Sequence, residues 1–329
     1  MTNPVLKYLG NNHFLTTLIV LAVLWLAVEL KELLIIIFIS YIIMAALFPF
    51  SDFLTRKHIP KVLSVLILYL IIITVLVLLI FPLVPFTISQ IQLLFNSFPK
   101  YIDQVAKIPN LRIDQSSVNN FFKTDINLIG TNALNITGSI FSGIFSVFTV
   151  LIISFYLMLE KETLTKQLIT LFPKKYQENA LTTITQIDSK IGLWLRAQLV
   201  FSFAIGVITW GGLAILGLPF ALPLGLITGL MEIIPIIGVI ISAALAVIVA
   251  LTISPGLAVS VIVFYLLLQV IKNNIAFPRI MQKAVGLNPI VIILGILIAT
   301  KFLGIIGALI AIPLITVILI IIKSLKPSY

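Results

Sequence analysis

Long apolar runs separated by short polar segments constrain this chain more than any other feature of its sequence. Six runs are about as long as a helix that crosses the ~30 Å hydrocarbon core of a bilayer, and they cover residues 14–28, 33–50, 62–85, 138–159, 193–217 and 256–271. Two longer runs cover 219–252 and 288–322. With 60% apolar and 10% charged residues, the chain cannot cover a water-soluble fold with polar side chains. We therefore predict an all-α fold, a polytopic membrane helical bundle.

The two longest runs are too long to be single straight spans. They hold 34 and 35 residues, and at ~1.5 Å per residue each would reach about 50 Å as one helix. Helix breakers lie near their middles: Pro235 and Gly238 in the first, Gly304 and Gly307 in the second. We predict two broken helical hairpins, at 219–252 and 288–322. The limbs are either short spans or re-entrant arms.

The basic residues favour these hairpins and give an orientation. With two hairpins, 14 Lys and Arg side chains fall on one side of the membrane and 5 on the other; with two single spans the tally is 11 to 8. Cytoplasmic loops carry an excess of Lys and Arg. We therefore expect a multi-pass plasma-membrane protein with both termini cytoplasmic. The net charge of +10 is then a property of its loops, and we expect the lipid bilayer as partner and no nucleic acid.

The polar segments divide the chain into three regions. Residues 1–85 hold the first three membrane spans. Residues 86–137 form an extracytoplasmic amphipathic segment, which either gates the outer mouth or packs on the bundle or on a neighbouring subunit. Residues 138–329 form the transport core, which contains both hairpins and a cytoplasmic helical segment, 160–192, punctuated by Pro173.

The two broken runs resemble each other. Residues 232–242 align without gaps on residues 301–311, at a constant offset of 69. In both, a charge is followed by a breaker three residues on, a glycine six residues on and a small residue ten residues on. Many transporters are built from repeats whose broken helices face a central site. An inverted structural repeat and a chance alignment of Ile-rich sequence both remain open.

Glu232 is the only acidic residue deep inside an apolar run. A charge near the bilayer centre costs several kcal/mol, so it needs a partner, water or a proton. Lys301, its counterpart in the alignment, is the partner we expect. Three alternatives remain: a pair that couples transport or binds solute, a structural ion pair that locks the two hairpin tips together, and two snorkelling side chains that never meet.

A second polar face precedes the last long run. Gln269, Lys272 and Asn273 lie at i, i+3 and i+4 and therefore share one side of a helix, with Tyr265 one turn earlier and Asn274 adjacent. These amides either donate hydrogen bonds to a polar solute or join helices at the end of a span.

Glycines at four-residue spacing, Gly225 and Gly229, point to close packing between membrane helices. No nucleophile elbow, phosphate loop or zinc spacing is present, and two histidines without a cysteine cannot build a metal cage. We expect no enzymatic activity, no cofactor and no metal site. The candidate residues for solute binding or coupling are Glu232, Pro235, Gly238, Gln269, Lys272, Asn273, Asn274, Lys301, Gly304 and Gly307.

Several short motifs are similar to those of a known family. They lie at residues 155–160 (FYLMLE), 171–175 (LFPKK), 216–219 (LGLP), 233–238 (IIPIIG), 274–281 (NIAFPRIM), 285–289 (VGLNP) and 304–313 (GIIGALIAIP). Through them the chain resembles the autoinducer-2 exporter family of bacterial membrane proteins. The resemblance implies a multi-span inner-membrane transporter that forms homo-oligomers. Members of the family are linked to export of the quorum-sensing signal autoinducer-2, and others to sodium(lithium)/proton antiport.

Three functions follow from these observations. The first is a permease that exports a small polar solute, with autoinducer-2 as a candidate, through a site between the hairpin tips and the face at 265–274. The second is a sodium(lithium)/proton antiporter in which Glu232 alternates between a proton and a monovalent cation. The third is an oligomeric scaffold or passive channel.

Overall fold

The computed structural model describes residues 13–78, 133–234, 237–251, 253–272, 286 and 289–325. Throughout this part the chain forms helices and no strand, so the predicted all-α membrane bundle is confirmed. Most of the predicted segment 86–137 lies outside the described residues. The helices are α2 (His13–Glu29), α3 (Lys31–Arg56), an unlabelled helix (Lys61–Leu78), α6 (Ala133–Leu159), α7 (Lys161–Thr170), the short 3₁₀ helix η1 (Lys174–Tyr176), α8 (Gln177–Ile215), α9 (Ala221–Met231), α10 (Ile237–Leu251), α11 (Pro255–Ile271) and α13 (Pro289–Ser324).

Helix length separates the candidate spans into two classes. By length and composition, four helices in the described part can cross a membrane: Lys31–Arg56, Lys61–Leu78, Lys174–Ile215 and Ile290–Ser324. By contrast α9 has 11 residues and α10 has 15, so they reach about 16 and 22 Å. Neither crosses ~30 Å of hydrocarbon alone, which favours a re-entrant arm for this hairpin.

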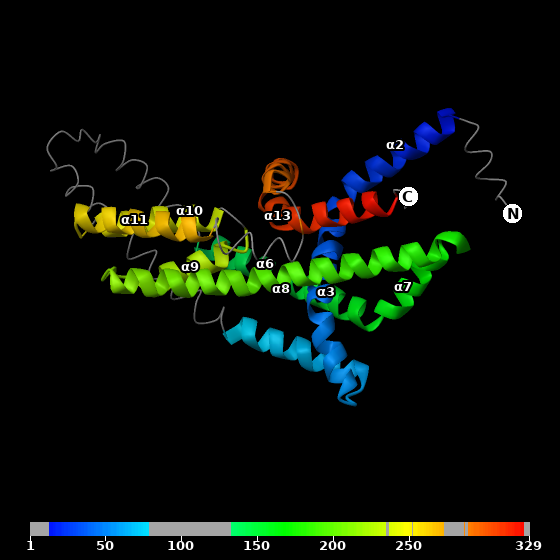
Figure 1. The fold of residues 1–329 in the computed structure, drawn as a ribbon, viewed down its shortest axis with the longest axis horizontal. Coiled ribbons are helices and arrows are strands. Elements are labelled where there is room, and N and C mark those ends of the chain that lie inside the picture. Colours follow the sequence, from blue (N-terminus) through cyan, green and yellow to red (C-terminus); the bar gives the residue numbers. More distant parts are fainter. Residues whose placement is uncertain are drawn as a thin grey trace.

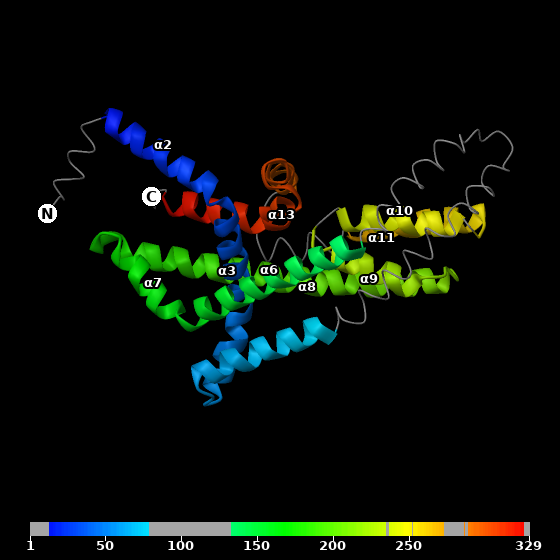
Figure 2. The same cartoon turned by 180° about the vertical axis from the view of Figure 1, so that it is seen from behind.

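Helix α8 organises the molecule. It has 39 residues, about 58 Å, and runs along the long axis in Figure 1. Helices α9, α10 and α11 lie beside its C-terminal half, while α3 crosses its N-terminal half and α7 folds back beneath it (Figure 1). Figure 2, seen from behind, shows α6 on the opposite side. The start of α2 and the end of α13 lie toward the same end of the molecule as the turn between α7 and α8.

The turn that follows α8 is dictated by a glycine. Gly217 has φ +71°, a conformation that costs a glycine little. Its N–H donates to the Ala214 carbonyl at 3.0 Å, and the Leu218 N–H donates to the Leu213 carbonyl at 3.0 Å. These two bonds, with Leu213 and Leu218 both buried, form a Schellman cap that ends the helix. The chain then reverses, and α9 runs back along α8.

The first long run breaks where the sequence predicts. Helix α9 ends at Met231 and α10 begins at Ile237, and the pair folds into a hairpin whose tip lies near the middle of α8 (Figure 1). Gly238 closes the tip, because a Cβ at this position would lie 2.4 Å from the backbone N of Glu232. Pro235 lies outside the described residues.

The second long run also breaks where the sequence predicts. Gly304 interrupts α13 with φ 60° and ψ −145°. A Cβ on Gly307 would lie 2.0 Å from the Ala299 carbonyl oxygen, and one on Gly295 would lie 1.9 Å from the Ile315 side chain. The two limbs therefore lie against each other. Gly238 and Gly307, equivalent in the internal alignment, each close a break against the preceding helix, whereas the inverted orientation of the repeat stays a prediction.

A charged cluster ties α7 to the spans. The Asp188 carboxylate on α8 accepts hydrogen bonds from the Tyr41 hydroxyl of α3 and, at 3.0 Å, from the Lys161 ammonium of α7. The same ammonium lies 3.4 Å from the centroid of the Phe48 ring. Lys161 and Asp188 are each about 15% exposed or less, so this contact is screened little by water.

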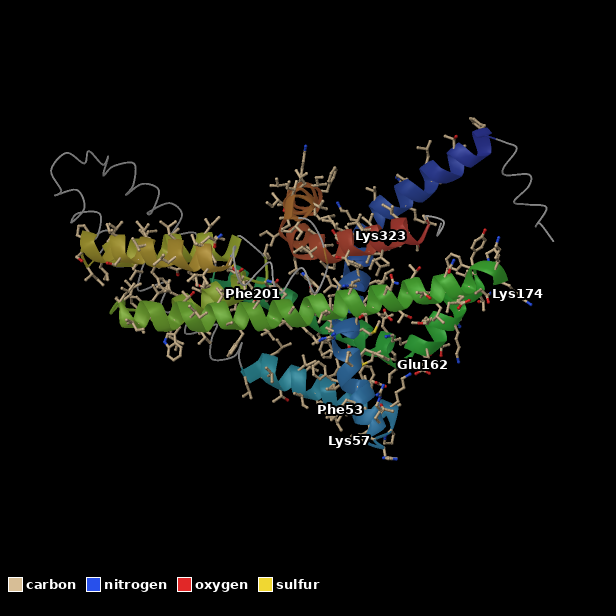
Figure 3. All side chains as sticks on the ribbon, in the orientation of Figure 1. Phe53, Lys57, Glu162, Lys174, Phe201 and Lys323 are labelled. Carbon is tan, nitrogen blue, oxygen red and sulfur yellow. The ribbon has the colours of Figure 1, made fainter. Side chains whose placement is uncertain are left out.

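A second ion pair joins the helix at Lys61–Leu78 to α7. The Lys61 ammonium donates to the Glu162 carboxylate at 3.0 Å. This hydrogen bond lowers the pKa of Glu162 below its ordinary value. Because the carboxylate is mostly exposed, the pair contributes little to stability. Its contribution is present above the ordinary pKa and is lost as the pH falls through the lowered value. Lys57 and Glu162 mark this end of the molecule in Figure 3.

The contact between α8 and α9 depends on glycines, as the spacing of Gly225 and Gly229 predicts. A Cβ on Gly225 would lie 2.6 Å from the Trp210 Cβ and 2.9 Å from the Gly206 carbonyl oxygen. A Cβ on Gly229 would lie 3.1 Å from the Ser202 carbonyl oxygen. Small residues of this kind let membrane helices approach at backbone distance.

We expect Gly225→Ala to lower the stability of the folded chain by about 1–3 kcal/mol, because the added methyl group overpacks the α8–α9 contact. Gly211→Ala on α8 is the matched control, since nothing lies within 4 Å of a Cβ at that position. Unfolding midpoints in detergent, followed by circular dichroism, measure both. Equal midpoints for the two variants would contradict the contact.

Candidate functional site

A buried ion pair lies where the tip of the first hairpin meets α11. The Lys272 ammonium donates to both carboxylate oxygens of Glu232, at 2.9 and 3.2 Å. Glu232 is 0% exposed and Lys272 is 2% exposed. Charges removed this completely from solvent are tolerated only when they are paired. The carboxylate and the ammonium therefore hold α9 and the end of α11 together.

The ends of the helices explain why the cation is needed here. Glu232 is the residue that caps the C-terminus of α9, and Lys272 is the C-terminal cap of α11. A helix C-terminus carries partial negative charge, which disfavours a carboxylate and favours an ammonium. Lys272 thus offsets both the Glu232 side chain and the ends of two helices.

Gln198 on α8 completes the site. Its side-chain N–H donates to the Glu232 backbone carbonyl at 2.7 Å. The last carbonyls of a helix have no partner within the helix, and no water is available for them in hydrocarbon. The fully buried Gln198 amide supplies one partner where α9 breaks. The site therefore draws on α8, α9 and α11.

The expected partnership of Glu232 with Lys301 is wrong. Lys301 is exposed on α13, and the partner of Glu232 is Lys272. Ile234, at the hairpin tip, packs against the apolar cluster that joins α3, α8 and α13. The charges of Glu232 and Lys301 do not meet.

Of the predicted polar face of α11, the structure describes Tyr265, Gln269 and Lys272. Tyr265 and Lys272 are buried, and the Gln269 side-chain oxygen is buried without a hydrogen-bond partner among the described residues. Lys272 is one of the 14 basic residues that the two-hairpin arrangement places on the cytoplasmic side, but it lies inside the bundle. Asn273 and Asn274 lie outside the described residues.

Two apolar clusters lie along α8, one on each side of Gln198. One cluster joins α3, the N-terminal half of α8 and α13, and a second joins the C-terminal half of α8 to α9, α10 and α11. Gln198 lies on α8 between Trp194 of the first cluster and Phe201 of the second. Phe201, labelled in Figure 3, lies on the part of α8 that passes beneath the hairpin.

The site combines a carboxylate, an ammonium and a side-chain amide. Within the described ranges, no group of three or more His, Cys, Asp or Glu side chains lies together. The paired charges cancel, and the Gln198 amide of α8 contacts the backbone beside them. Such a set suits an uncharged polar molecule within a membrane.

Comparison of the sequence with known protein families indicates a transport role. The family model described as AI-2E family transporter matches residues 14–326. The chain belongs to the AI-2E transporter family. It is thus a membrane transporter by family, and its apolar helices supply the membrane-embedded part.

Several bacterial transport proteins align with most of this chain. YrrI of Bacillus subtilis (strain 168) is 28% identical over 305 residues, which cover 88% of this chain and 85% of YrrI. YueF of the same strain is 28% identical over 284 residues, covering 80% and 77%. Both are named for transport, and neither name states a substrate. The AI-2 transport protein TqsA of Escherichia coli (strain K12) is 26% identical over 299 residues, covering 86% of this chain and 83% of TqsA.

Gln198 is the site residue that the sequence analysis missed. It lies in the apolar run 193–217, where an uncharged amide does not stand out as Glu232 does. The available signal was its position on the helical stripe of Ile191, Trp194 and Phe201, which places it on the buried side of α8.

We expect Glu232→Gln or Lys272→Gln alone to destabilise the protein by about 3–5 kcal/mol, because each leaves a buried charge without its partner. The double variant should cost less than the sum of the two, since it leaves no charge. A double-mutant cycle on unfolding midpoints in detergent measures this coupling. Lys301→Gln is the control and should change stability by no more than about 0.5 kcal/mol. Additive effects of the two single variants would contradict the pair.

Proposed function

We propose that this AI-2E family transporter exports a small, uncharged, hydroxyl-rich solute across the bacterial plasma membrane, with autoinducer-2 as the first candidate. The observation that carries the proposal is the neutralised Glu232–Lys272 pair, with the Gln198 amide against the Glu232 carbonyl and Gln269 one turn before Lys272 on α11. A solute hydroxyl can both donate and accept hydrogen bonds, so it matches amide groups without needing a charge of its own. TqsA, which aligns with most of this chain, is named for AI-2 transport.

The geometry disfavours the second function, sodium(lithium)/proton antiport. A monovalent cation would compete with Lys272, which already contacts both oxygens of the Glu232 carboxylate. A cation would also have to replace its hydration shell with several oxygens, and Glu232 is the only acidic residue deep in an apolar run. We therefore infer that the Glu232–Lys272 pair is a fixed neutral element and not a site where ions exchange.

The third function, a scaffold or passive channel, explains the buried pair as a structural lock but leaves the Gln269 amide without a role. The Gln269 side-chain oxygen is buried with no hydrogen-bond partner among the described residues, which costs about 1–3 kcal/mol. A binding role for this oxygen accounts for that cost. We also propose that the protein forms homo-oligomers, as the family resemblance implies.

The proposed orientation places the turn between α7 and α8 in the cytoplasm. Lys174 and Lys175 lie in that turn and Lys161 and Lys166 on α7, which leads into it, and cytoplasmic loops are enriched in basic residues. Because the start of α2 and the end of α13 point toward the same end of the molecule, both termini are cytoplasmic in this proposal.

The test is transport by purified protein in liposomes. We expect saturable flux of autoinducer-2 down its gradient, unchanged when sodium or pH gradients are collapsed. Gln269→Leu should raise the half-saturating concentration roughly 2–10-fold, the equivalent of one hydrogen bond. Lys301→Gln, whose side chain is exposed, is the control and should leave transport unchanged.

Two outcomes would overturn the proposal. Proton movement driven by a sodium pulse, abolished by Glu232→Gln and without solute flux, would establish the antiporter. Absence of saturable flux for autoinducer-2 and for other small hydroxylated solutes would favour the scaffold or channel. Fluxes are compared per folded protein, because the Glu232 variant also loses stability.

A further inference from the structure

Several buried polar atoms have no hydrogen-bond partner among the described residues. They are the Trp194 indole N–H, the Gln198 and Gln269 side-chain oxygens, and the hydroxyl groups of Ser202, Thr209 and Tyr265. Each orphaned group costs about 1–3 kcal/mol when it stays dry, and such groups in native proteins usually hold water or a ligand.

Four of these groups follow one line along α8. Trp194, Gln198, Ser202 and Thr209 are separated by four, four and seven residues, so all lie on one helical face. That face is the buried one, because Ile205 and Leu213 on the same stripe are 4% and 0% exposed. The polar line therefore runs inside the bundle and not toward lipid.

The facing helices add hydroxyl groups to the same interior. Thr228 precedes Glu232 by one turn on α9, and its neighbour Gly229 lies against the Ser202 backbone of α8. The Tyr265 hydroxyl of α11 faces the hydroxyls of Thr228 and Ser242, without hydrogen-bond geometry to either. All four hydroxyl-bearing residues are at most 5% exposed.

Polar and apolar buried space differ in what they hold. A cavity lined by apolar side chains stays dry, whereas buried polar atoms that lack partners bind ordered water. In membrane proteins, buried polar side chains that face the bundle interior mark the routes of solutes and ions. The line along α8 begins beside the Glu232–Lys272 pair, with Gln198 as the shared residue, and continues toward Thr209.

We propose that a water-accessible passage runs inside the bundle along α8, past Gln198, Ser202 and Thr209, between α8 and the helices α9 to α11. Its occupant is water or an uncharged molecule that exchanges hydrogen bonds with hydroxyl and amide groups. The passage would give the solute of the proposed function a route from the ion pair. The inference rests on the proposed function only for the identity of that solute.

The chain contains no cysteine, so single substitutions report accessibility directly in the full-length protein. We expect Ser202→Cys and Thr209→Cys, in protein reconstituted in liposomes, to react with a small water-soluble methanethiosulfonate reagent. Thiolate chemistry requires water at the sulfur. Ala246→Cys is the matched control: Ala246 is 0% exposed and belongs to the apolar cluster that contains Phe201. The two passage positions should react roughly tenfold faster or more than this control.

Thr182→Cys, at an exposed position of α8, verifies that the reagent is active, and circular dichroism verifies that each variant is folded. Rates at 202 and 209 as slow as at 246 would overturn the passage, even if solute flux were present. Rapid reaction at 202 and 209 without flux of any hydroxylated solute would support the passage and reject the proposed solute class.

Discussion

A carboxylate and an ammonium withdrawn together from water fix the centre of this protein. Neither Glu232 nor Lys272 is stable alone in an apolar interior, so the hairpin tip and the end of α11 must meet. Gln198 joins α8 to the same point through the carbonyl of Glu232. The interruption of α9 is tolerable because protein groups, and not lipid, satisfy the backbone that it frees. The buried pair and the broken helix therefore depend on each other.

The glycines make this arrangement geometrically possible. Gly225 and Gly229 bring α9 to backbone distance from α8, and Gly238 lets α10 start directly against the end of α9. Gly307 has the same task at the bend of α13. Interfaces made from small residues give close packing where no hydrophobic force acts between helices in lipid. Longer side chains at these positions would move Glu232 away from Lys272.

The fold followed from the sequence more readily than the site. The lengths of the apolar runs predicted the helices, and Gly238 and Gly304 predicted the positions of the two breaks. Both could be predicted because the thickness of the hydrocarbon core and the backbone freedom of glycine act on local sequence. The partner of Glu232 was not predictable in this way. The internal alignment pointed to Lys301, but contact depends on how α11 ends beside the tip, and Lys272 resembled the basic end of an ordinary span. Gln198 carries no charge, so only knowledge of which face of α8 is buried identifies it.

The most direct test of this account is which lysine position lies beside residue 232. In the cysteine-free chain, the pair Glu232→Cys with Lys272→Cys should be cross-linked within one molecule by a short bifunctional thiol reagent. The pair Glu232→Cys with Lys301→Cys should not. Mass spectrometry of the proteolysed protein identifies the linked peptides. Cross-linking of 232 to 301 without linking of 232 to 272 would contradict the central ion pair.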